Sequence, residues 1–193
     1  MDDKKRLILV NRTHSIPSDW SDHLQLVSFQ YNGESFLLEQ ETYSAFERLR
    51  KKVLENRLIL GVASAYRSSE EQKELYEEMA RDYGPEKAKT LCALPGHSEH
   101  ETGLAVDIEV TMEASETQEE VKYSDGYFYR CVHEHLAEYG FILRYPKGKE
   151  QITEYSFEPW HIRCVGNPHA SIMWEQNLAL EEYLEKQKQF LQI

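Results

Sequence analysis

The stretch SEHETGLAVD, residues 98–107, joins a polar loop to the beginning of an apolar strand. Successive side chains of a strand point to opposite faces, so Leu104 and Val106 share one face while Ala105 and Asp107 share the other. Ala105 is small and leaves room for a ligand beside the Asp107 carboxylate. We therefore expect a strand that begins at Leu104 and carries a functional aspartate on its polar face.

A histidine precedes this strand at a distance that suits metal binding. His100 lies in the loop, and Gly103 permits a sharp turn that swings the imidazole back towards Asp107. Imidazole and carboxylate are ligands that zinc accepts, and a catalytic zinc ion usually takes three protein ligands. His161, further along the chain, is the candidate for the third ligand.

His161 belongs to the stretch EPWH, residues 158–161, which also holds a carboxylate. Residues three apart in a regular strand face opposite sides, so Glu158 and His161 can share a site only if the backbone turns there. Pro159 favours such a turn, because proline fixes its own φ and restricts the residue before it. The pattern predicts a His/Asp/His zinc site with Glu158 as the base that takes a proton from water.

Other histidines do not form a competing zinc motif. His133 and His135 flank a glutamate, but they stand two residues apart, whereas the motif H-E-x-x-H places its histidines four apart on one helix face. We expect His135 to lie in the core. We expect His97 to lie near the site without binding metal.

The stretches 98–107 and 158–161 resemble the signature of the zinc D-alanyl-D-alanine peptidases of the VanY, VanX and VanXY type, which is S-x-H-x-x-G-x-A-x-D followed by E-x-W-H. A third block, YRS at residues 66–68 with Gln72, resembles the family's Y-R-[ST]-x-x-x-Q. The surrounding stretches that most resemble the VanXY and VanY branches are 93–96, 141–146 and 168–169.

The resemblance implies roles for individual residues. It implies one zinc ion per chain, held by His100, Asp107 and His161. It also implies that Glu158 acts as general base and then as general acid, and that Arg67 stabilises the oxyanion. The residues that we expect to bind substrate are Ser98, Gln72, Tyr66 and Trp160.

The activity that the resemblance implies is removal of the C-terminal D-alanine from peptidoglycan precursor peptides that end in D-Ala-D-Ala, with hydrolysis of the free dipeptide as an additional activity. The implied cellular role is cell-wall trimming or glycopeptide resistance. One alternative is an L,D-carboxypeptidase or a peptidoglycan endopeptidase of the same fold. Another is a non-catalytic zinc module that binds cell-wall peptides, but the presence of Glu158 argues against it.

The whole sequence predicts a single α+β domain over residues 1–193, with its core at about 34–185. The expected strands are 7–10, 24–29, 58–63, 104–110, 141–144 and 160–165. The expected helices are 39–56, 68–83, 86–91, 127–139, 169–176 and 180–191. Strands and helices do not alternate strictly, so we expect a mainly antiparallel sheet flanked by helices, with the apolar strand 58–63 at its centre. The resemblance implies the same class, a Hedgehog/DD-peptidase-like fold.

An acidic stretch, residues 111–125, follows the strand that carries Asp107. It has no sustained period, and a loop of this length in a compact domain is commonly a lid or a binding loop. We expect a surface loop at the rim of the zinc cleft that selects substrates by their length.

The composition disfavours several kinds of partner. The chain has 193 residues and a net charge of −12, which repels nucleic acids and anionic membranes. Its apolar stretches fall far short of the roughly 20 residues that span a bilayer, and its first residues lack the apolar segment of a secretory signal. We expect a cytoplasmic protein, although an extracytoplasmic domain trimmed of its membrane anchor would read the same. The sequence leaves the oligomeric state open.

Overall fold

The computed structural model describes residues 3–112 and 126–190. Its strands are β1 (Leu26–Tyr31), β2 (Glu34–Glu39), β3 (Leu58–Ser64), β4 (Ala105–Met112), β5 (Phe141–Leu143) and β6 (His161–Cys164). Its α-helices are α1 (Asp3–Arg6), α2 (Gln40–Leu54), α3 (Ser69–Tyr83), α4 (Pro85–Leu91), α5 (Gly126–Leu136), α6 (Glu150–Thr153), α7 (His169–Glu175) and α8 (Leu180–Phe190). The 3-10 helices are η1 (Trp20–His23), η2 (Glu99–Thr102) and η3 (Ala137–Tyr139).

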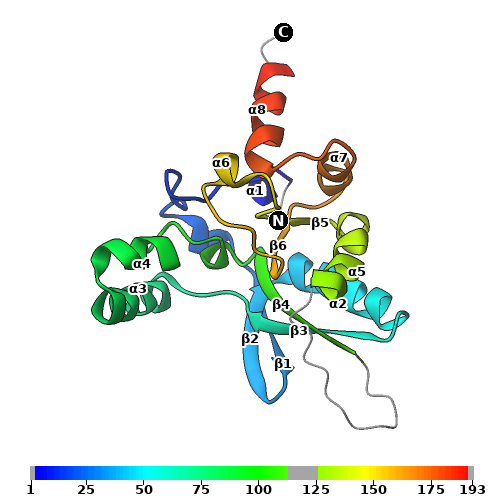
Figure 1. Cartoon of the computed structure of the whole chain (residues 1–193), viewed down its shortest axis with the longest axis horizontal. Helices are drawn as coiled ribbons and strands as arrows, with labels where there is room; N and C mark the ends of the chain where they lie inside the picture. Colours follow the sequence, from blue (N-terminus) through cyan, green and yellow to red (C-terminus); the bar gives the residue numbers. More distant parts are fainter. Residues whose placement is uncertain (1–2, 113–125, 191–193) are drawn as a thin grey trace.

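The strands form two antiparallel sheets (Figure 1). Strands β1 and β2 make a hairpin, and the other four lie in the order β3-β4-β6-β5. Every neighbouring pair in the larger sheet is antiparallel. The predicted α+β domain with a mainly antiparallel sheet flanked by helices is therefore confirmed.

Helices α2 and α5 cover one face of the larger sheet. Phe46 and Leu49 of α2 and Val132 of α5 lie in the same buried cluster as Val106 and Ile108 of β4. Apolar residues spaced three or four apart place one side of each helix against the strands. Strand β4 turns its alternate side chains to the opposite face, which leaves that face free to carry polar groups.

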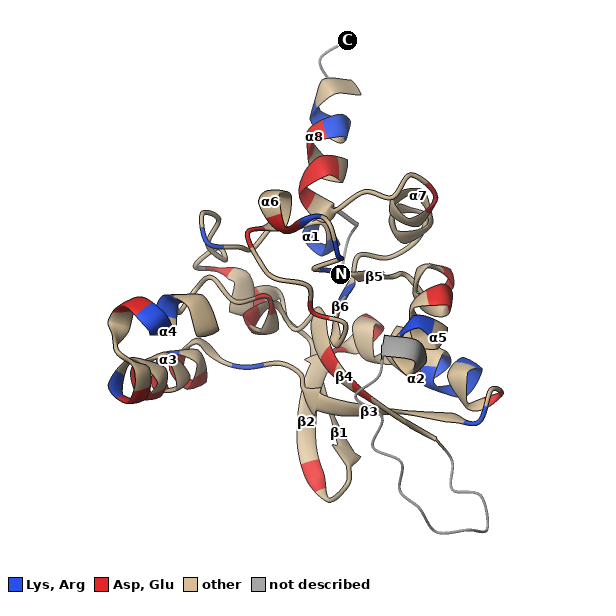
Figure 2. Ribbon diagram, viewed as in Figure 1, with Lys and Arg blue, Asp and Glu red and all other residues tan. Residues whose placement is uncertain are grey.

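A second apolar cluster lies under helices α7 and α8. Ala170 and Met173 of α7 and Leu180 of α8 pack with Ile142 of β5. The neighbouring Phe141 belongs to the first cluster, so strand β5 joins the two clusters into one core. Charged residues run along helices α3, α4 and α8, as Figure 2 shows.

The N-terminal part differs from the prediction. Residues 7–10 form no strand, because the carbonyls of Arg6 and Ile8 each accept a hydrogen bond from Arg163 Nη2 at 2.9 Å instead of from a neighbouring strand. The prediction also misses strand β2. Its hairpin turn is formed by Asn32 and Gly33, with φ angles of 49° and 84°, and Asn-Gly is a strong hairpin signal in a sequence.

Strand β3 lies at the edge of its sheet, so the prediction of a central strand was wrong. Its apolar run is explained by coverage from other elements. Arg50 Nε of α2 donates a hydrogen bond to the Leu60 carbonyl at 3.0 Å, and the Tyr31 side chain packs closely against Gly61. An edge strand that is covered in this way reads in sequence like a central one.

The end of β4 and the presence of a short helix also differ from the prediction. Strand β4 continues to Met112, beyond the predicted end at 110, so residues 111 and 112 belong to the sheet. The rest of the predicted acidic loop, 113–125, lies outside the described residues. The short helix α6 was not predicted. No helix within 3–112 or 126–190 is both long and apolar enough to span a membrane.

Candidate metal centre

His100 is held in place by a turn and by a backbone hydrogen bond. It lies in η2, which ends at Gly103 with a left-handed φ of 72°. Its Nδ1 is 2.7 Å from the Ala65 carbonyl, which can only accept a hydrogen bond, so this nitrogen donates. The other nitrogen, Nε2, is 3.2 Å from Asp107 Oδ2. The ring is thus fixed with Nε2 turned towards the aspartate.

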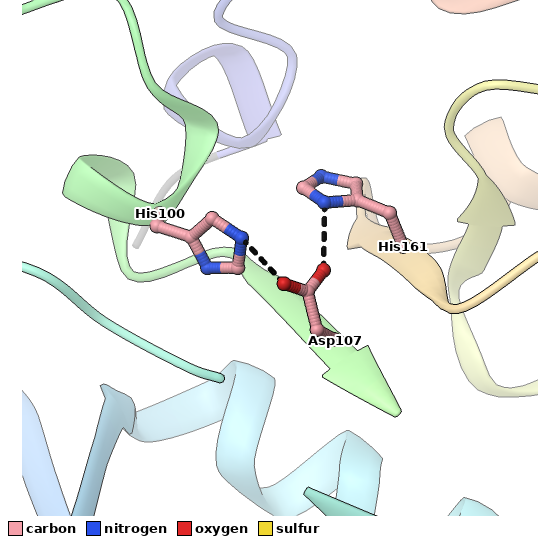
Figure 3. A group of neighbouring side chains, drawn as sticks. All are labelled: His100, Asp107 and His161. Carbon is pink, nitrogen blue, oxygen red and sulfur yellow. Dashed lines mark hydrogen bonds and ion pairs between the residues drawn. The ribbon is translucent and has the colours of Figure 1, made fainter. Parts of the chain in front are cut away.

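His161 approaches the same aspartate from the neighbouring strand. It is the first residue of β6 and pairs directly with Asp107 of β4. Residues that are opposite each other on paired strands have their side chains on one face. His161 Nδ1 lies 2.9 Å from Asp107 Oδ1. Figure 3 shows the two imidazoles turned towards one carboxylate from different elements.

The three side chains fit a metal ion. One ligand atom each from His100, Asp107 and His161 can be chosen so that all lie within 4.8 Å of one another. The predicted spacing therefore brings these residues together. Two imidazoles and a carboxylate are a donor set that suits catalytic zinc, and hydrogen bonds from the opposite ring nitrogens are typical of metal-binding histidines. His161 meets this second condition as well, because its Nε2 lies 3.4 Å from Glu99 Oε2.

The pKa values of Asp107 and His161 lie far from their ordinary values. Burial alone would raise the pKa of Asp107, but hydrogen bonds from His100 and His161 hold this pKa well below its ordinary value. Burial opposes a charge on His161, yet hydrogen bonds to Asp107 and Glu99 raise its pKa to about 9. Before metal binding, the cluster thus keeps a negative carboxylate between the two imidazoles.

The predicted turn brings Glu158 to the site. The Glu158 amide donates a hydrogen bond to the Tyr145 carbonyl at 3.1 Å, and the His161 amide donates one to the Glu158 carbonyl at 3.4 Å. Glu158 Oε2 then lies 4.0 Å from His161 Nδ1. Burial raises the pKa of the Glu158 carboxyl above its ordinary value. A carboxylate with a raised pKa beside a metal site is suited to proton transfer.

His133 holds the same turn from helix α5. Its Nε2 lies 2.8 Å from the Pro159 carbonyl, and the side chain is buried. The prediction that His135 is the core histidine was wrong, because His135 is only partly buried and lies 3.4 Å from Asn56. The buried stripe of α5 passes through residues 128, 132 and 136, and His133 lies beside it.

A cavity of about 270 Å³ opens onto the candidate metal centre. Its lining includes the three candidate ligands, and the other predicted site residues found there are Arg67, Gln72, Ser98, Glu158 and Trp160. Tyr66 is not part of this lining: it is partly buried, and its amide is bonded to the Leu37 carbonyl. His97 stays outside the ligand set and faces the Asn11 carbonyl at 2.8 Å.

Arg67 is fixed from two sides. Its Nη1 donates a hydrogen bond to Gln72 Oε1 at 2.8 Å and its Nη2 donates one to Ser64 Oγ at 3.1 Å. The Gln72 amide group in turn donates to the Ala93 carbonyl at 2.8 Å, and Gln72 is 1% exposed. Both polar ends of Gln72 are therefore occupied by the protein, which makes it a support for Arg67.

Several cavity residues were not predicted from the sequence. Glu99, Tyr145 and Tyr155 line the cavity, and the Tyr145 ring centroid is 4.9 Å from that of His161. Glu99 stands inside the 98–107 motif but reads there as an ordinary polar loop residue. Tyr145 lies in the stretch 141–146, which resembles the VanXY and VanY branches, but no motif marks either tyrosine as a cavity residue, and the three-dimensional arrangement identifies both.

Comparison with known proteins decides the family. The model of the VanY family, described as D-alanyl-D-alanine carboxypeptidase, matches residues 35–167, which include every candidate ligand. The chain belongs to the VanY family. A relative from Enterococcus gallinarum, the bifunctional D-Ala-D-Ala dipeptidase and D-Ala-D-Ala carboxypeptidase VanXYC, is 35% identical over 179 residues, with 92% of each protein covered. A D-alanyl-D-alanine carboxypeptidase of Enterococcus faecalis is 36% identical, and the alignment covers 94% of this chain and 66% of that protein.

Solved structures of VanY relatives share the fold. A mutant of VanY from a VanB-type resistance cassette, solved with Zn(II), is 34% identical with a TM-score of 0.77, covering 93% of this chain and 99% of that one. VanYB in complex with D-alanine-D-alanine matches with the same identity, 34%, and the same TM-score, 0.77, covering 93% of this chain and 97% of that one. The LD-carboxypeptidase LdcB is also 34% identical with a TM-score of 0.77, covering 95% of this chain and 87% of that one.

Proposed function

We propose that this VanY-family chain is a zinc-dependent carboxypeptidase that removes the C-terminal D-alanine from peptides ending in D-Ala-D-Ala. The observation that carries the proposal is the convergence of His100, Asp107 and His161 beside Glu158 in one cavity. The family relatives that bear this activity in their names support the choice of substrate. The proposal includes one zinc ion per chain, held by the two histidines and the aspartate.

In this proposal Glu158 moves the proton. Zinc, when bound, supplies Lewis acidity, which polarises a carbonyl group and makes water easier to deprotonate. Glu158 takes a proton from the water that attacks the scissile carbonyl and returns it to the nitrogen of the departing D-alanine. Burial raises the pKa of the Glu158 carboxyl, which strengthens it as a base and lets it hold the proton between the two steps.

Arg67 supplies positive charge where negative charge develops. The carbonyl oxygen gains charge as water attacks, and a cation that is already positioned stabilises it without rearranging. Arg67 is positioned in this way by Gln72 and Ser64. Ser98 and Trp160, which also line the cavity, are the residues proposed to contact the peptide. Gln72 acts in this scheme through Arg67.

A second candidate is an L,D-carboxypeptidase. It is favoured by the LdcB structure, which matches this chain as well as the VanY structures do, with a TM-score of 0.77. The two activities differ in the configuration of the residue before the final D-alanine. A D-residue at that position marks the first activity and an L-residue marks the second.

The experiment supplies the zinc-loaded protein with three substrates and measures released D-alanine. These are the dipeptide D-Ala-D-Ala, a pentapeptide ending in D-Ala-D-Ala, and the tetrapeptide that ends in a single D-alanine after an L-residue. The proposal expects release from the pentapeptide and none from the tetrapeptide. Release from the tetrapeptide alone would replace it with the second candidate, and binding without release from any substrate would replace it with a non-catalytic module.

A further inference from the structure

A buried cluster of charged side chains lies next to His161, at its Nε2 atom. Glu99, Arg144 and Arg163 have side chains with 0% exposure. Arg144 Nε and Arg163 Nη1 both donate hydrogen bonds to the same oxygen, Glu99 Oε1, at 2.6 and 2.7 Å. The other oxygen, Oε2, is turned towards His161 Nε2 at 3.4 Å. The two carboxylate oxygens therefore have separate partners.

The cluster is balanced in charge and fixed by surrounding elements. Arg144 also binds Glu181 of α8 through both terminal nitrogens, at 3.0 and 2.7 Å, so two arginines face two glutamates. Arg163 Nη2 donates to two backbone carbonyls of the N-terminal segment, each at 2.9 Å. Two cationic guanidinium groups within hydrogen-bond distance of one Glu99 oxygen favour the charged form of its carboxyl. Glu99 is thus an ionised carboxylate with little freedom to rotate.

An ionised carboxylate can only accept hydrogen bonds, so it pairs with a ring nitrogen that carries hydrogen. In a neutral imidazole the hydrogen on one nitrogen leaves the lone pair on the other. We propose that Glu99 is a positioning residue that keeps the hydrogen of His161 on Nε2 and so directs the lone pair of Nδ1 towards the metal site. The proposal rests on the zinc site of the proposed function.

The two histidines then use opposite nitrogens. His100 donates from Nδ1 to the Ala65 carbonyl and presents Nε2 to Asp107. His161 faces Glu99 with Nε2 and presents Nδ1 to Asp107. A backbone carbonyl selects the tautomer of the first ring, and a side-chain carboxylate selects that of the second. A side chain can be substituted and a backbone carbonyl cannot, so His161 is the ligand whose tautomer a substitution at Glu99 can change.

The substitution Glu99→Gln tests the role sharply. Arg144 and Arg163 require an acceptor, so the amide oxygen must take the place of Oε1, and the NH₂ group then faces His161 Nε2. Two N–H groups cannot hydrogen-bond to each other, so the amide favours the His161 tautomer with a lone pair on Nε2 and a hydrogen on Nδ1. Nδ1 is the nitrogen that should bind the metal. Substitution of a residue that hydrogen-bonds to a metal ligand typically lowers metal affinity by about 10- to 100-fold. We expect the zinc affinity of Glu99→Gln to fall by a similar factor.

Glu181→Gln is the matched control. It removes one negative charge from the same cluster and loosens Arg144, but Glu181 does not touch His161. We expect this variant to keep zinc affinity within a few-fold of wild type. An equal loss of affinity in both variants would assign the effect to cluster charge and would overturn the role of Glu99.

The deciding readout is the tautomer of His161, measured by long-range ¹H–¹⁵N correlation spectra of the zinc-loaded protein. The wild type should show hydrogen on Nε2 of His161 and on Nδ1 of His100. Hydrogen on Nδ1 of His161 would overturn the proposal, even if Glu99→Gln failed to fold. Unchanged zinc affinity in folded Glu99→Gln would overturn it as well. D-alanine release by the wild type is recorded separately, and its absence would count against the proposed function alone.

Discussion

Glu158 is the residue whose chemistry is easiest to separate from metal binding. It lines the cavity and lies 4.0 Å from a candidate ligand without belonging to the ligand group. The change Glu158→Gln keeps the shape of the side chain but removes its ability to accept a proton. We expect zinc binding to persist and turnover to fall by about 10²-fold or more, as is typical when a general base is lost. Turnover and zinc content are measured on the same preparation, and near-normal turnover would remove Glu158 from the mechanism.

His133 contributes to stability in a way that depends on pH. Burial lowers its pKa below the ordinary value of 6.5, and its Nε2 faces the Pro159 carbonyl. The unfolded chain therefore binds a proton at His133 more readily than the folded chain does. The contribution of neutral His133 to the free energy of unfolding is therefore complete above pH 6.5. It is lost as the pH falls from 6.5 towards the lower pKa of the folded state.

The variant His133→Gln tests this contribution, because glutamine can also donate to the Pro159 carbonyl and does not titrate. We expect its free energy of unfolding to fall less between pH 7 and pH 5 than that of the wild type, as measured by urea denaturation at each pH. His135→Gln, at a partly exposed position on the same helix, removes a histidine that does not bond to the Pro159 carbonyl, and it is the control for the substitution itself. Parallel curves for wild type and His133→Gln would show that His133 does not titrate in this range.

At the scale of single elements, η2 depends on one glycine. Gly103 has a left-handed φ of 72°, and an added Cβ would lie 3.3 Å from the backbone nitrogen of Glu39. A non-glycine residue in this conformation costs about 1–2 kcal/mol, and the backbone neighbour leaves little room to relax. We expect Gly103→Ala to lower the free energy of unfolding by about this amount and to weaken zinc binding, because η2 carries His100.

Gly148→Ala is the control for that change. Gly148 also has a positive φ, 86°, but an added Cβ would meet no atom within 4 Å. Its substitution should lower stability through backbone strain alone and leave zinc affinity unchanged. Denaturation and zinc titration measure both effects. Equal zinc affinity in the two variants would mean that the shape of η2 does not control the position of His100.

At the scale of the whole molecule, local patterns predicted much of the fold and which side chains come together at the candidate metal centre. His100 and Asp107 are close in sequence, and strand alternation alone turns Asp107 away from the core, as the structure has it. The residue types also made His161 the candidate for the third ligand, but its position opposite Asp107 on the neighbouring strand is known only from the structure. Apolar periodicity likewise located α2, α3 and α5 to within a few residues at each end, because α2 and α5 each pack one side against the strands and α3 packs against α4.

What the sequence did not show depends on contacts between distant segments. Strand β3 reads as central because other elements cover it: Arg50 of α2 donates to its Leu60 carbonyl, and Tyr31 of the hairpin packs against its Gly61. The charge cluster joins Glu99, Arg144 and Arg163 from three separate segments, and each alone reads as a surface residue. Long-range pairings of this kind leave no periodic signal in the sequence.

The most direct test of zinc-dependent D-alanine release at this site is a zinc titration of the metal-free protein, with release from a pentapeptide ending in D-Ala-D-Ala as the signal. We expect no release before zinc is added, a linear rise as zinc is added, and a plateau at one zinc ion per chain. His161→Ala should stay at the baseline under the same conditions, whereas His135→Ala should follow the wild type. Release that persists without zinc would show that the activity does not need the metal, and a plateau that His161→Ala also reaches would show that His161 is not a zinc ligand.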